Sequence, residues 1–62
     1  MTHVVREKQR LLNRISRLQG QVDAIELAVD TDVGCNEVMR QLATVHGATY
    51  GMMAEMVEDH IQ

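Results

Sequence analysis

Hydrophobic residues recur at alternating steps of three and four along two stretches of the chain. In the first stretch the repeating positions are Leu11, Ile15, Leu18, Val22, Ile25 and Val29. In the second stretch they are Val38, Leu42, Val45, Thr49, Met52 and Met56. Such steps match the period of an α-helix, whereas a half-buried strand would alternate at every second residue. The pattern therefore predicts two helices, over residues 4–29 and 35–60.

A short polar segment separates these two helices. Asp30, Thr31, Asp32 and Gly34 are residue types that favour turns and helix ends. Glu37 lies three residues beyond Gly34, where its carboxylate can help to close the first turn of a helix. The chain contains no proline and is rich in strong helix formers. We expect an all-α fold in which residues 1–62 form one domain, an antiparallel helical hairpin.

The chain is too short to bury a large core alone. It has 62 residues and one cysteine, and chains below about 70 residues usually depend on disulfides, metals or partner subunits. A second apolar line runs along another face of the 35–60 helix and comprises Cys35, Met39, His46, Tyr50, Met53, Val57 and His60. Small residues four apart, Ala43, Gly47 and Gly51, would allow another helix to approach closely. We therefore expect this helix to pack on its copy in a homodimer that assembles further.

The sequence shows neither a membrane-spanning segment nor a signal peptide, and these two features bear on where the protein is located. No run of the sequence approaches the roughly 18 apolar residues that a membrane span needs. The first residues carry charge and lack the apolar region of a signal peptide, so we expect a cytoplasmic protein without a membrane partner. Because no paired acid and base and no phosphate-binding loop is present, we do not expect an enzyme.

The charge of the chain is divided between its two parts. The formal net charge is -3, but residues 1–20 carry +4 and residues 21–62 carry -7. The cations of the first part are Arg6, Lys8, Arg10, Arg14 and Arg17. The four arginines form a stripe beside the apolar face of the first helix, and arginine suits bidentate contacts to phosphate. No aromatic residue is nearby to stack on single-stranded bases, so we predict binding to duplex DNA; a solvated helix face is the alternative.

A candidate metal site involves three residues that are distant in sequence. Cys35 and His60 lie 25 residues apart, about 37 Å along a helix, so they cannot meet within one chain. If the second helix pairs antiparallel with its copy and crosses near Gly47, Cys35 faces His60 of the partner subunit. The hairpin brings His3 level with His60. We therefore predict a site of His3, Cys35 and His60 between subunits, suited to Ni(II), Co(II) or Zn(II).

Other interpretations of these residues remain open. A single cysteine is more commonly a small buried side chain, and a histidine near a terminus is more commonly unbound. His46 is expected to be an interface residue rather than a ligand. As the first residue of a helix, Cys35 would also be suited to react with an electrophile, because the helix dipole favours its thiolate.

Several segments together resemble one known family. The runs RISRLQGQVDAI over residues 14–25 and QLATVHGA over residues 41–48, with Cys35 and His60, are similar to the CsoR/RcnR family of small helical bacterial repressors. The resemblance covers nearly the whole chain. It implies a transcriptional repressor in which antiparallel hairpins form dimers and then a homotetramer. Such a repressor binds operator DNA through basic helix faces and releases it when it binds a metal or, in one branch, formaldehyde.

The resemblance also bears on the signal that is sensed. His3, Cys35 and His60 match the nickel- and cobalt-responsive RcnR type, which also uses its N-terminal amine. Formaldehyde-responsive members share Cys35 and His60 but typically have proline after the first methionine, where this chain has Thr2. Family members usually continue for about one more helix, which this chain does not contain. The alternatives are a formaldehyde-responsive repressor using Cys35 and the N-terminal amine, and a helical oligomerisation module that binds no DNA.

Overall fold

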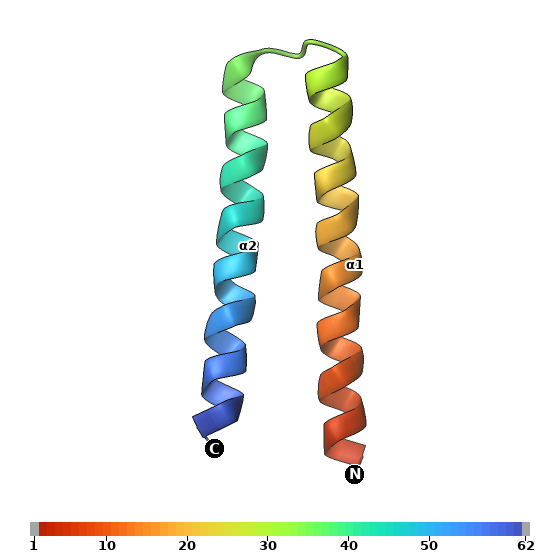
Figure 1. The fold of residues 1–62 in the computed structure, drawn as a ribbon, viewed down its shortest axis with the longest axis vertical. Helices are drawn as coiled ribbons and strands as arrows, with labels where there is room; N and C mark the ends of the chain where they lie inside the picture. Colours follow the sequence, from red (N-terminus) through yellow and green to blue (C-terminus); the bar gives the residue numbers. More distant parts are fainter. Residues whose placement is uncertain (1, 62) are drawn as a thin grey trace.

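Two helices account for nearly all of the described chain. The computed structural model describes the backbone of residues 2–61 and the side chains of residues 7–58. Within that range the chain forms α1 (Thr2–Asp30) and α2 (Cys35–Ile61), with no strand. The two helices run antiparallel as a hairpin with dimensions of 47 × 18 × 8 Å (Figure 1). The predicted helices over 4–29 and 35–60 are confirmed, with ends that differ by one or two residues.

Hydrogen bonds to the last turn of α1 form the connection between the helices. The amide of Val33 donates to the carbonyl of Ala28 at 3.1 Å, and the amide of Asp32 donates to the carbonyl of Val29 at 3.2 Å. This pair of bonds is the Schellman arrangement, in which one residue adopts a left-handed conformation. Asp32 adopts it here, with φ 55°, and Gly34 has φ 110°. The turn predicted at residues 30–34 is therefore confirmed.

These two positive φ angles predict opposite effects of substitution. Gly34→Ala should destabilise the hairpin by about 1 kcal/mol or more, because a φ near 110° is almost confined to glycine. Asp32→Gly should instead be neutral or mildly stabilising, because glycine is preferred at this helix-ending position. Thermal unfolding followed by circular dichroism measures both effects. Equal effects of the two variants would contradict this account of the connection.

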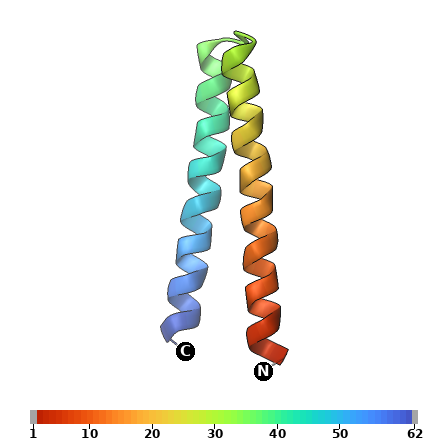
Figure 2. The ribbon, with the colours of Figure 1, turned by 45° about the vertical axis from the view of Figure 1, so that its right-hand side comes forward.

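The helices contact each other through a regular line of inward residues. On α1 the line comprises Leu11, Arg14, Leu18, Gln21, Ile25 and Ala28, all at least half-buried. On α2 it comprises Val38, Gln41, Val45, Ala48, Met52 and Glu55. The helices diverge from the connection toward their free ends (Figures 1 and 2). The small, buried Ala28 lies near the connection, and the long side chains of Arg14 and Glu55 lie toward the open end.

The predicted apolar faces are correct only in part. Leu11, Ile15, Leu18 and Ile25 are half-buried on α1, and Val38, Val45 and Met52 are half-buried on α2. The other predicted positions are exposed: Val22, Val29, Leu42, Thr49 and Met56. One residue turns a helix by about 100°, so the adjacent polar positions Gln21 and Gln41 take the inward places instead.

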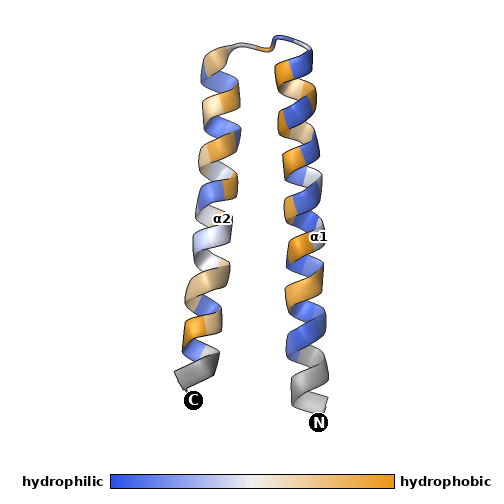
Figure 3. Cartoon of the chain, in the orientation of Figure 1, coloured by the Kyte–Doolittle hydropathy of each residue, from blue (hydrophilic) through white to orange (hydrophobic). Residues whose placement is uncertain are grey.

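Much apolar surface remains exposed on the hairpin. Ala28 is the one buried hydrophobic residue among the described side chains. Large side chains at least 46% exposed are Leu12, Val22, Leu27, Val29, Val33, Met39, Leu42, Tyr50, Met53, Met56 and Val57. Figure 3 shows apolar residues along the described length of both helices. The accessible surface is 5273 Å², whereas a compact monomer of this mass would expose only about 4,000 Å². The excess shows that the hairpin alone leaves much apolar surface uncovered.

No described helix is both long enough and sufficiently apolar to cross a membrane.

Candidate nucleic-acid interface and metal-ligand positions

Two arginines of the predicted basic stripe are paired with carboxylates. The Arg10 guanidinium donates to Glu7 and to Glu55, each at 3.2 Å. The Arg14 guanidinium donates to the other carboxylate oxygen of Glu55. Glu55 therefore bridges two turns of α1 from the facing helix. Sequence analysis placed Arg14 beside the buried face, but its side chain is only 29% exposed and lies against α2.

These pairs change which cations of the stripe are free. The cluster of Glu7, Arg10, Arg14 and Glu55 carries two positive and two negative formal charges. Arg17 is exposed and forms no ion pair with any described side chain. Lys8 is also exposed and unpaired among the described side chains, but it lies outside the stripe, about 200° round the helix from Arg10. Arg6 was also predicted to bind DNA, but its side chain lies outside the described residues. Of the three stripe arginines whose side chains are described, Arg10 and Arg14 are thus paired with carboxylates and Arg17 is not.

The guanidinium of Arg14 lies near Gly51 of α2. A Cβ atom built on Gly51 would lie 3.5 Å from Arg14 Nη2, which is ordinary contact distance. No described atom lies within 4 Å of the same position on Gly47. An alanine side chain at position 51 would therefore fit beside Arg14, and the contact within the hairpin does not require glycine there. The open space at Gly47 is compatible with the predicted close approach of another helix.

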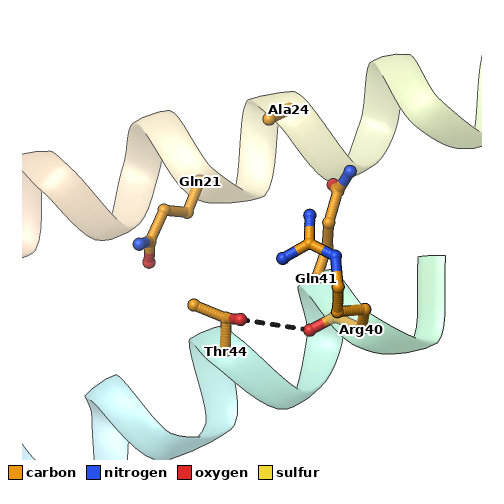
Figure 4. Close-up of a pocket in the computed structure, with 5 residues that line it drawn as sticks. All are labelled: Gln21, Ala24, Arg40, Gln41 and Thr44. Carbon is orange, nitrogen blue, oxygen red and sulfur yellow. Dashed lines mark hydrogen bonds between the residues drawn. The ribbon is translucent and has the colours of Figure 1, made fainter. Parts of the chain in front are cut away.

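A shallow hollow lies between the helices, nearer the connection. Its lining residues are Gln21 and Ala24 of α1 and Arg40, Gln41 and Thr44 of α2 (Figure 4). Its volume is about 270 Å³, and the Oε1 atoms of Gln21 and Gln41 are buried without a recorded hydrogen-bond partner. Thr44 donates to the carbonyl of Arg40, within its own helix. None of the predicted site residues lines this hollow. Its inward glutamines, Gln21 and Gln41, interrupt the apolar contact between the helices.

Cys35 is the first residue of α2 and follows Gly34 directly. It is exposed and forms no disulfide. Two residues further, the Glu37 carboxylate accepts hydrogen bonds from Arg40 and Gln41 rather than closing the turn as predicted. The hydrogen bond from Arg40, with a second from Gln41, lowers the pKa of Glu37 to about 2. A negative charge thus persists in the first turn of α2, where it interacts favourably with the helix dipole.

The two histidines predicted as ligands belong to the opposite end of the hairpin from Cys35. His3 lies in the first turn of α1 and His60 in the last turn of α2, and the side chains of both are outside the described residues. His46 is exposed in the middle of α2. Among the side chains at residues 7–58, no three potential ligands are close enough to hold a metal ion. The described part of a single chain therefore contains no complete metal site.

Sequence reasoning missed Glu55 and the inward glutamines. Glu55 is one of the acidic residues of the negatively charged part 21–62, and it lies at helical spacing from Ala48 and Met52, seven and three residues away. This spacing was an available signal, because it places Glu55 on the side of α2 that also carries Val45.

Comparison with known proteins identifies a family model and relatives that match this chain. Residues 7–62 match the model of a family described as metal-sensitive transcriptional repressors. An uncharacterized protein in the bioA 5′ region of Serratia marcescens is 39% identical over 62 residues, covering 100% of this chain and 68% of the relative. A transcriptional repressor RcnR homolog of Escherichia coli is 39% identical over 61 residues, covering 98% of this chain and 68% of the relative.

No solved structure matches the chain with significance. The family model nevertheless covers all but the first six residues, and the similarity to the RcnR homolog extends over almost the whole chain. The chain therefore belongs to the CsoR/RcnR family of metal-sensitive transcriptional repressors.

Proposed function

We propose that this protein is a Ni(II)- or Co(II)-responsive repressor that binds operator DNA without metal and releases it when metal binds. Membership of a metal-sensitive repressor family over residues 7–62 carries this proposal. The exposed cations Lys8 and Arg17 support contact with DNA phosphates. The exposed thiol of Cys35 supports metal binding, because a thiolate is a strong ligand for divalent transition metals.

The metal site in this proposal is completed by a second subunit. Cys35 lies at the connection end of the hairpin, and the helical turns that carry His3 and His60 lie at the open end. An antiparallel pairing of α2 with its copy would place Cys35 of one subunit near the histidines of the other. One thiolate with two imidazoles suits Ni(II) or Co(II), and Zn(II) is the next candidate. Cys35 is exposed and forms no disulfide, so its thiolate is free to join such a donor set.

The same pairing accounts for the apolar surface of α2. Met39, Leu42, Tyr50 and Met53 are exposed and recur at helical spacing along one side of the helix. Burying this side between two hairpins would form a four-helix homodimer, and two homodimers would form the homotetramer. In the repressor, residues 1–62 act as one domain that both binds DNA and senses the signal in the cytoplasm.

Titration with Ni(II), with formaldehyde as a parallel arm, tests the proposed signal. Ni(II) should bind with a thiolate-to-metal charge-transfer band, and formaldehyde should leave the mass of the protein unchanged. The absence of the band, together with a covalent mass increase after formaldehyde, would replace the metal by formaldehyde as the signal. The absence of both responses in a protein that also binds no duplex DNA would identify a helical oligomerisation module.

A further inference from the structure

Glu55 occupies two arginines of the predicted DNA-binding surface at once. Its Oε1 accepts a hydrogen bond from Arg10 Nη2 at 3.2 Å, and its Oε2 accepts one from Arg14 Nη1. The side chain of Glu55 is 45% exposed, and those of Arg10 and Arg14 are 56% and 29% exposed. The bridge therefore lies at the surface of the hairpin, where a ligand from solution can reach it.

A carboxylate and a phosphate offer the same kind of partner to a guanidinium. Each presents anionic oxygens that accept paired N–H donors. Both terminal nitrogens of Arg10 are engaged, one by Glu7 and one by Glu55. A DNA phosphate that takes these engaged donors must therefore share them with the carboxylates or displace one of the carboxylates.

The ion pairs of Glu55 with Arg10 and Arg14 are partly exposed to solvent. They should therefore affect the binding of DNA more than the stability of the fold. Ion pairs between partly exposed side chains contribute little to folding, because water and salt screen them. Arg17 forms no ion pair with a described side chain and can make the first phosphate contact on this side of α1. Arg10 and Arg14 would then engage the backbone only against the competing carboxylate.

We infer that Glu55 acts as an intramolecular competitor of DNA phosphate and thereby weakens the binding of the repressor to duplex DNA. The inference rests on the proposed DNA-binding function and identifies a residue that regulates its strength. Removing the charge of Glu55 should release Arg10 and Arg14 for phosphate contacts. The duplex affinity should rise as a result.

The test compares Glu55→Gln with Glu58→Gln, using a short mixed-sequence DNA duplex at low salt. Glu58 lies one turn further along α2, is exposed, and forms no ion pair with a described side chain, so its substitution makes the same change in net charge. Glu55→Gln should tighten binding by about three- to tenfold, as expected when surface ion pairs no longer compete. Glu58→Gln should change the affinity by less than about twofold, because an exposed charge without a partner is screened.

A double-mutant cycle separates competition from a general charge effect. In an Arg10→Ala/Arg14→Ala background, Glu55→Gln should give no more gain than Glu58→Gln. Circular dichroism reports whether each variant keeps its helices. If Glu55→Gln loses helicity, Glu55→Ala, with the strongest helix former, is measured instead and should show the same gain.

Three results would overturn the inference while leaving DNA binding intact. These are equal affinities of Glu55→Gln and Glu58→Gln, weaker binding by a fully helical Glu55→Gln, and a gain that persists without Arg10 and Arg14. A wild-type protein that binds no duplex would instead refute the proposed DNA-binding function, and the inference would fail with it.

Discussion

Replacing Cys35 with alanine is expected to abolish the thiolate-to-metal charge-transfer band on addition of Ni(II) and to lower the Ni(II) affinity by more than about 100-fold. The magnitude follows because even the outer-shell partners of metal ligands contribute about 10- to 100-fold to affinity. Cys35 is exposed at the first residue of α2, so its replacement removes a donor without opening a cavity. Absorbance titration and competition with a metal chelator measure the two effects.

His46→Ala provides the matched control for this experiment. His46 is exposed on the same helix, eleven residues from Cys35, which is about 16 Å along the helix axis. The charge-transfer band should persist in this variant, because His46 is expected at the interface between subunits and not among the ligands. A Cys35→Ala protein that retains the full Ni(II) affinity would exclude the thiolate as a ligand.

The double variant Arg14→Ala/Arg17→Ala is expected to bind duplex DNA about 100-fold more weakly than the wild-type protein at low salt. A hydrogen bond to a charged group contributes about 1.5–3 kcal/mol, so two full phosphate contacts would contribute about 3 kcal/mol or more. Competition from Glu55 lowers the share of Arg14, which leaves a loss of about 100-fold. The slope of log affinity against log salt should also fall by about 1.8, since each phosphate contact contributes about 0.9. Fluorescence anisotropy over a range of salt concentrations measures both values.

Arg40→Ala is the control for the loss of positive charge. Arg40 lies on α2, is exposed and pairs with Glu37, away from the stripe of α1. Its substitution should leave the salt slope nearly unchanged. If Arg40→Ala and the double variant reduce the slope equally, the stripe is not the surface that contacts DNA. Circular dichroism of the double variant confirms that loss of the Arg14–Glu55 pair has not unfolded the hairpin.

The secondary structure could be predicted from the sequence because it depends on local signals. The apolar steps of three and four, the absence of proline and the turn residues at 30–34 all indicate the same two helices. The face that each helix presents to the other was predicted less well. Gln21 and Gln41 occupy inward positions, because a shift of one residue places the neighbouring valine and leucine on the outside.

The pairing of the arginines could not be predicted because it depends on contact between residues distant in sequence. Arg14 and Glu55 are 41 residues apart, and only the relative register of the two helices brings them together. The position of Cys35 at the start of α2 was predicted correctly, because the preceding Gly34 ends the turn. The joining of Cys35 to His3 and His60 stays a prediction, because it depends on the arrangement of two subunits.

Metal binding is proposed to weaken the binding of this repressor to DNA, and the duplex affinity with and without Ni(II) tests this most directly. The measurement compares the metal-free protein and the Ni(II)-loaded protein, at one fixed salt concentration, on a duplex selected from a random-sequence pool for tight binding to the metal-free protein. The account predicts tight, salt-dependent binding without metal and an affinity about 5- to 150-fold weaker with Ni(II), the usual range of allosteric coupling. Equal affinities in the two states, or tighter binding with Ni(II), would contradict it.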